Sequence, residues 1–162
     1  MEIALREALW KGVGFGLTSG VITTLGVIVG LQSGTHSKLA VLAGIIVLAV
    51  ADALSDAVGI HVSEEAEMKH TTRELWSAAF FTFLSKAVFT LSFLVPIMLL
   101  ELSTAIVVSV FWGLFLTTVF SFYMARVQNK NPVKVVAEHV LVTVAVVLLA
   151  HYVGDLIYAV FI

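Results

Sequence analysis

Long apolar stretches alternate with short polar segments along this chain, and the pattern predicts its fold. A helix needs about 20 apolar residues to cross the hydrocarbon core of a bilayer. Five stretches meet this length, at about 10–31, 39–62, 75–100, 104–125 and 135–161. Polar or helix-breaking residues separate them. We therefore expect an all-α integral membrane bundle of five transmembrane helices.

The second predicted helix is longer than its apolar part. Residues 63–70 (SEEAEMKH) follow the span, are mostly polar and contain neither glycine nor proline. Such a sequence can continue a helix into water. The second helix is therefore expected to extend into the cytosol.

Composition supports a membrane protein and narrows the classes of function. Of the 162 residues, 60% are hydrophobic and 12% charged, and the mean hydropathy is +1.06. We expect a single transmembrane domain over residues 1–162 and no soluble domain. The lack of cysteine excludes thiolate metal sites, and a net charge of −2 without a basic run argues against a nucleic-acid partner. No nucleophile motif, phosphate loop or dinucleotide fingerprint is present, so we do not expect an enzyme.

The basic residues predict the orientation in the membrane. The first apolar stretch has no A-x-A-type cleavage site, so we interpret it as a transmembrane helix and not as a removed signal peptide. Lys38 alone falls on one side of the predicted membrane, with Lys86 set apart as intramembrane. The opposite side carries seven basic residues: Arg6, Lys11, Lys69, Arg73, Arg126, Lys130 and Lys134. This bias predicts a cytosolic amino terminus and an external carboxyl terminus.

Three ionisable residues lie inside predicted spans. Asp52 and Asp56 are four residues apart in the second span, so their carboxylates share one helical face, and Lys86 lies in the middle of the third span. Each such charge costs on the order of 2.5–3.5 kcal/mol at mid-membrane and marks a candidate ion or proton pathway. Lys86 is either a switch that a cation displaces or a permanent partner of the aspartates. A structural interhelical hydrogen-bonding pair is the simpler alternative for the two aspartates.

Acidic residues and one histidine continue the same face beyond the second span. Carboxylates and imidazole are ligands for divalent iron and manganese. We therefore consider a cytosolic metal-capture site formed by Glu64, Glu67, His70 and Glu74. The alternative is an ordinary solvated helix end, and His61 and Met68 are weaker candidates still.

The fifth span carries a second pair of ionisable residues. His151 and Asp155 lie four residues apart near its predicted external end. They are either an exit-side proton relay or an interfacial pair.

The first span carries glycines at four-residue spacing: Gly12, Gly16 and Gly20. Small residues at this spacing allow a close approach of another helix. They predict a helix-packing interface, either within the chain or across a dimer axis, and neighbouring hydroxyls such as Ser19 and Thr23 either bond between helices or line a path.

Two segments resemble signatures of the vacuolar iron transporter family. Residues 16–26 (GLTSGVITTLG) resemble the G-x-N-D-G-x-x-[ST]-T-x-G signature of its first helix. Residues 53–63 (ALSDAVGIHVS) resemble the A-x-S-M-A-x-G-E-Y-x-S signature that ends its second helix. Val153 and Gly154, late in the fifth span, also fit the family.

The resemblance implies a five-helix homodimer that exports ferrous iron, and often manganese, from the cytosol in exchange for protons. The chain departs from the family at Ser19, where an aspartate is expected, and at Asp56, where a methionine is expected. Ile60 and His61 replace a glutamate and a tyrosine. Without the methionine sulfur, the oxygen ligands suit manganese or another divalent ion at least as well as iron.

The segment between the second and third spans is short, whereas plant and yeast-like members carry a helical metal-binding domain there. The compact chain therefore resembles a prokaryotic relative, which implies a location in the cell membrane.

These observations lead to one leading hypothesis and two alternatives. The leading hypothesis is a divalent-cation transporter in the lipid bilayer, driven by protons, with no tightly bound cofactor. Its predicted metal and proton pathway consists of Asp52, Asp56, Ser19, Thr23 and Lys86. The alternatives are a non-transporting membrane binding or scaffold protein of the same fold, and a transporter of another cation, for example an organic one.

Overall fold

The computed structural model describes residues 2–68 and 70–161. The elements, in chain order, are α1 (Glu2–Thr35), α2 (Lys38–Val47), the π-helix η1 (Leu48–Asp52), α3 (Ala53–Ala66), α4 (Thr72–Ser92), α5 (Leu94–Leu99), α6 (Leu102–Val127) and α7 (Pro132–Phe161). Every regular element in the described residues is helical, which confirms the predicted all-α class. Lys69, one of the residues behind the predicted charge bias, lies outside the described part of the chain.

Five helical stretches in the described residues are long and apolar enough to cross a membrane: Arg6–Thr35, Lys38–Ala66, Thr72–Leu99, Leu102–Val127 and Pro132–Phe161. Many large apolar side chains on these stretches are exposed, as expected for helices that face lipid. Five helices of this kind agree with the five predicted stretches, and the chain has the character of a multi-pass membrane protein.

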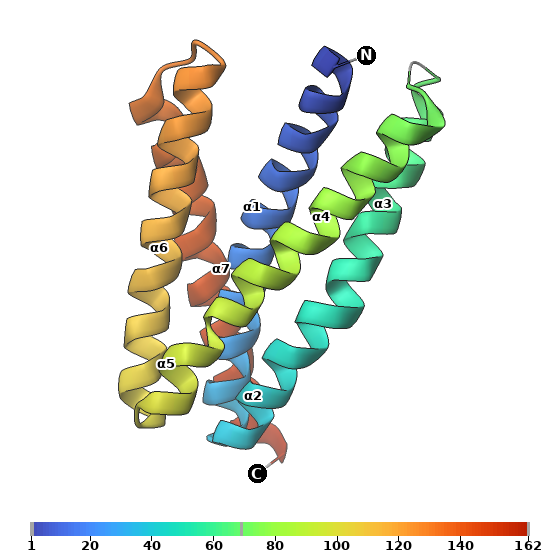
Figure 1. Cartoon of the computed structure of the whole chain (residues 1–162). Helices are drawn as coiled ribbons and strands as arrows, with labels where there is room; N and C mark the ends of the chain where they lie inside the picture. Colours follow the sequence, from blue (N-terminus) through green and yellow to red (C-terminus); the bar gives the residue numbers. More distant parts are fainter. Residues whose placement is uncertain (1, 69, 162) are drawn as a thin grey trace. The chain divides into compact units, whose positions relative to one another are not determined.

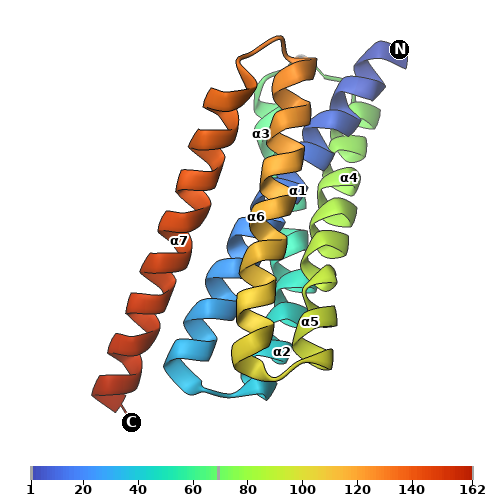
Figure 2. The same cartoon turned by 90° about the vertical axis from the view of Figure 1, so that its left-hand side faces the viewer.

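The helices form two compact units. The first unit comprises the chain up to Gly20 together with Ile46–Ser92, and the second comprises Val21–Ile45 and the chain from Phe93 onward. In the first unit α3 and α4 run side by side (Figure 1). In the second unit α6 and α7 form a helical hairpin, joined at the top of Figure 2.

The second helix ends before the end of the polar segment 63–70, through which the sequence predicted it to continue. Helix α3 stops at Ala66, and Met68 takes a left-handed backbone conformation with φ of 51°. A helix cannot continue through such a residue. The prediction of helix as far as residue 70 is therefore wrong, although α3 does run past the predicted span end at residue 62.

The third span is interrupted near its end. Helix α4 ends at Ser92 and α5 begins at Leu94. Pro96 has no N–H group to bond the carbonyl of Ser92, and its ring crowds that carbonyl. The break therefore follows from the proline.

Lys38 has a structural role within the second unit. Its Nζ donates hydrogen bonds to the carbonyl oxygens of Leu100, at 2.9 Å, and Met98, at 3.4 Å. A cation at a helix C-terminus satisfies carbonyls that lack intrahelical partners. Lys38 is the one basic residue on the predicted external side, and this contact explains why a lysine is found there.

The glycines of the first span pack against α4 of the same chain. A Cβ atom at Gly12 would lie 2.5 Å from the carbonyl oxygen of Ala78, and one at Gly16 would lie 2.5 Å from that of Thr82. At Gly20 it would lie 3.2 Å from the Lys86 carbonyl oxygen. Because α4 lies against this face, the contacts favour the alternative in which these glycines pack within the chain. Their predicted role in helix packing fits the contacts.

We predict that Gly16→Ala lowers the free energy of unfolding by about 1–3 kcal/mol, because the added methyl group overpacks the contact with α4. Gly59 is the matched control, since nothing lies within 4 Å of a Cβ there. Gly59→Ala should be neutral or stabilising, because alanine favours helix over glycine. Reversible denaturant unfolding in detergent micelles measures both variants. Equal effects at the two positions would contradict the packing role.

Candidate functional site

Three helical elements of the first unit bring opposite charges together inside the spans. Lys86 Nζ on α4 lies 2.5 Å from Oδ2 of Asp52 and 2.5 Å from Oδ2 of Asp56. Ser19 on α1 donates a hydrogen bond of 2.6 Å to Asp56 Oδ2 and accepts one of 3.0 Å from Lys86. We call these four residues the ion-pair cluster.

The sequence forms this cluster through helical spacing and a glycine. Asp52 and Asp56 lie about one turn apart, so both carboxylates reach the same side of α4. Lys86 is only 1% exposed, and its stem lies against α1. A Cβ at Gly20 would lie 3.2 Å from Lys86 Cγ. Glycine at this position therefore leaves room for the buried lysine.

A π-helical turn leads directly into the cluster. Element η1 ends at Asp52, and the N–H of the following Ala53 bonds the carbonyl of Leu48, five residues earlier. Such turns widen a helix locally and occur frequently at functional sites. Asp52 is the last residue of this widened turn, and Asp56 lies in the first turn of α3.

The two aspartates have different environments. Asp56 accepts hydrogen bonds from Lys86 and Ser19. Asp52 Oδ2 forms only the ion pair, and it is buried without a hydrogen-bond donor among the described residues. The two carboxylates are therefore held differently, Asp52 by the ion pair alone and Asp56 by the ion pair together with Ser19.

The cluster has an uneven charge. With both carboxylates ionised, two negative charges face the single positive charge of Lys86. The cluster then carries one net negative charge in a region of low dielectric constant, where this is unfavourable. One additional positive charge, from a proton or from a cation, balances it.

Thr23, the remaining residue of the predicted pathway, lies one turn beyond Ser19 on α1 and is half-buried. Its role in a pathway stays a prediction.

The predicted capture residues gather around His70, although they do not share one helix. His70 Nε2 lies 3.3 Å from Glu64 and 3.9 Å from Glu67, and its Nδ1 lies 3.7 Å from Glu74. Glu64 is at the end of α3, whereas Glu74 is in the first turn of α4. The chain reverses between them, so the two helix ends meet at the histidine.

Lys11 also contacts this acidic group, a contact that the sequence analysis did not predict. Its Nζ donates hydrogen bonds of 2.8 Å to both carboxylate oxygens of Glu64. A cavity of about 40 Å³ lies beside this pair. Within the described residues no group of three or more histidine and acidic side chains is arranged to hold a metal ion. Metal capture here stays a prediction.

The second unit brings His151 and Asp155 together with a serine. His151 Nε2 lies 3.4 Å from Asp155 Oδ2, and its Nδ1 contacts Ser33 Oγ on α1. Gly154 permits this approach, since a Cβ there would lie 2.6 Å from the Gly30 carbonyl oxygen. The sequence signal for Ser33 was weak, because it is one of several polar residues that end the first span. A relay function for the group is untested.

The chain was compared with models of known protein families and with curated proteins, and no match was found. The resemblance to the vacuolar iron transporter family therefore rests on the motifs at residues 16–26 and 53–63.

We predict that Asp56→Asn destabilises the protein more than Asp52→Asn does. The first substitution weakens two hydrogen bonds and one ion pair, which we expect to cost about 2–3 kcal/mol, whereas the second weakens only one ion pair and should cost about 1 kcal/mol. Denaturant unfolding in micelles measures the difference. Glu138→Gln, at an exposed carboxylate of α7, is the control and should have little effect. A larger effect at Asp52 would contradict the assigned contacts.

Proposed function

We propose that this chain is a proton-coupled transporter that exports divalent cations of the iron or manganese type from the cytosol. Asp52 and Asp56 form the intramembrane site that metal and protons share. The observation that carries the proposal is the buried Lys86 held between both carboxylates, next to a π-helical turn. Intramembrane charges at this cost are typical of ion and proton pathways.

Charge balance supports exchange of metal for protons. With both carboxylates protonated, Lys86 gives the cluster a charge of +1. With both ionised and one divalent cation bound, the charge is again +1. Replacement of two protons by one divalent cation therefore leaves the charge inside the membrane unchanged, which avoids a large electrostatic cost.

Lys86 acts in this proposal as a tethered competitor for the metal. Its ammonium group and an incoming cation need the same carboxylate oxygens. The four-carbon stem of lysine is flexible, so the ammonium can move aside while the helices stay in place. Competition of this kind weakens cation binding, and a transported ion must leave its site as well as enter it.

The ligand set suits the proposed substrate. Two carboxylates and the hydroxyl of Ser19 are hard oxygen ligands, which manganese and ferrous iron accept and which give no preference for softer ions. The cluster is not a closed cage of protein ligands, as a resident structural metal would require. Binding of the cargo ion is therefore expected to be transient.

Two peripheral groups complete the proposed route. Glu64, Glu67, His70 and Glu74 would attract cations at the cytosolic end, where Lys11 reduces the local negative charge. His151 and Asp155, with Ser33, would accept or release protons at the external end. This assignment rests on the orientation predicted from the basic residues, with a cytosolic amino terminus, in a prokaryotic cell membrane. We propose a homodimer whose interface does not involve the face of Gly12, Gly16 and Gly20.

A non-transporting membrane protein is the second candidate. The observation in its favour is that Lys86 already neutralises one carboxylate charge and contacts both aspartates. A permanent ion pair of this kind would hold α1, α3 and α4 together without any transport.

Transport assays in proteoliposomes test the proposal. Protein reconstituted into liposomes should take up Mn²⁺ or Fe²⁺ with opposite proton flow, with Co²⁺ and Zn²⁺ as comparison ions. The double variant Asp52→Asn with Asp56→Asn should reduce uptake to the level of protein-free liposomes, because it removes both charges that bind cation and proton. Glu138→Gln should transport as the wild type does.

The other possible results of this assay would support a different function for the chain. Uptake that persists in the double variant would rule out the shared carboxylate site. Competition by organic cations in place of metals would assign the same site to another substrate. No flux of any cation, from protein that unfolds normally in micelles, would support the non-transporting candidate.

A further inference from the structure

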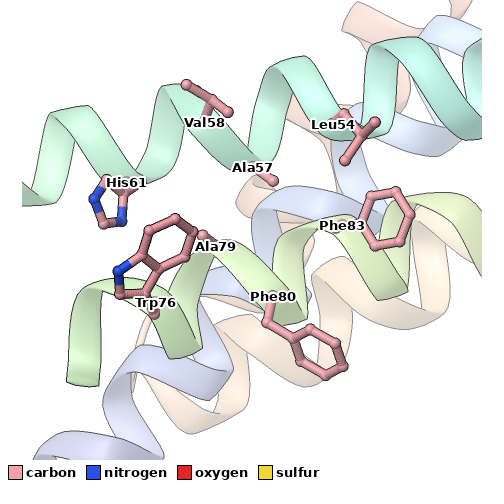
Figure 3. Close-up of a pocket in the computed structure, with 8 residues that line it drawn as sticks. All are labelled: Leu54, Ala57, Val58, His61, Trp76, Ala79, Phe80 and Phe83. Carbon is pink, nitrogen blue, oxygen red and sulfur yellow. The ribbon is translucent and has the colours of Figure 1, made fainter. Parts of the chain in front are cut away.

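An apolar groove runs between α3 and α4 in the first unit, away from the ion-pair cluster. Its volume is about 300 Å³, and Figure 3 shows the side chains that line it. The buried Ala57 and Ala79 form its floor, one from each helix. Larger side chains, including Leu54 and Phe83, form its walls. The groove exists because two small residues face each other where larger ones flank them.

One end of the groove carries two aromatic rings that contain nitrogen. His61 and Trp76 lie next to each other there, with ring centroids 4.5 Å apart, whereas Leu54 and Phe83 lie at the other end (Figure 3). His61 Nδ1 is buried and has no hydrogen-bond partner among the described residues. Helix α3 ends and α4 begins within about two turns of these rings. This end therefore lies at the depth of lipid headgroups, where amphipathic rings are typical.

Two opposite charges flank the same end of the groove. Glu65 follows His61 by four residues on α3, and Arg73 precedes Trp76 by three on α4, so each charge shares a helical face with a residue of the groove. Both side chains are exposed, and neither has an ion-pair partner among the described residues. The floor of the groove is apolar. Towards the end of α3 and the start of α4 it is followed by the ring of His61 and then by the opposite charges of Glu65 and Arg73.

We propose that this groove is a binding site for one zwitterionic phospholipid. An acyl chain lies over Ala57 and Ala79, with the rings of His61 and Trp76 at the headgroup end of the groove. Arg73 pairs with the phosphate group and Glu65 with the headgroup amine. A second copy of the chain would cover the apolar part but would leave the charges of Glu65 and Arg73 without complementary groups. Lipid binding in this groove does not require that the chain transports cations.

Lipid titration followed by native mass spectrometry tests this site. Purified full-length protein is titrated with phosphatidylethanolamine and with phosphatidylglycerol of the same acyl chains. The wild type should bind one phosphatidylethanolamine more tightly than phosphatidylglycerol, because Glu65 repels an anionic lipid that lacks an amine. Arg73→Gln and Phe80→Ala should each weaken phosphatidylethanolamine binding by about fivefold, as expected for the loss of one contact.

Matched variants on exposed surfaces are the controls. Lys130→Gln removes a cation from the loop between α6 and α7, and Phe111→Ala removes a lipid-facing aromatic ring from α6. Both should leave lipid binding unchanged. Equal or tighter binding of phosphatidylglycerol, or equal effects of groove and control variants, would overturn the proposal. Dissociation of a dimer by Phe80→Ala, with lipid binding unchanged, would assign the groove to a second copy instead.

Discussion

An ionised side chain inside a lipid bilayer must find an opposite charge, and this requirement organises the first unit of the chain. Lys86 satisfies it by contact with Asp52 and Asp56, which fixes α4 against α3 and draws Ser19 of α1 into the same group. The helices pack closely beside this contact, since a Cβ atom at Gly20 would lie 3.2 Å from Cγ of the lysine. The charge that remains after pairing is the chemical property on which the proposed exchange depends.

The low polarity of the surroundings also explains where the helices depart from regularity. Backbone groups inside lipid must bond each other, so a span stays helical except where a neighbour supplies the missing partner. The π-helical turn η1 keeps its N–H groups bonded while it widens the helix before Asp52. The break before Pro96 follows from a missing N–H, and the ammonium of Lys38 binds carbonyls beyond it. Each irregularity has a local chemical cause.

Sequence reasoning predicted the helices well, because a span needs only a sufficient run of apolar residues. It also identified Asp52, Asp56 and Lys86, since a charge inside such a run is rare. It failed where the answer depended on which surfaces meet. The glycines of α1 indicated a close neighbour without indicating that this neighbour is α4. Ser33 and Lys11 looked like ordinary polar residues until the fold placed them beside His151 and Glu64. The left-handed conformation occurs at Met68, which is not a glycine, so the sequence did not indicate a turn there.

The short connection between Ala66 and Thr72 has a consequence for synthesis of the protein. The second span leaves the ribosome with two aspartates and no partner, and the lysine that pairs with them arrives only with the third span. Each span alone would enter lipid with an unpaired charge. A connection of this length lets the two helices meet before either is released laterally into the bilayer. Membrane insertion of this protein is thus favoured as a helical hairpin, with charge pairing completed at the insertion machinery.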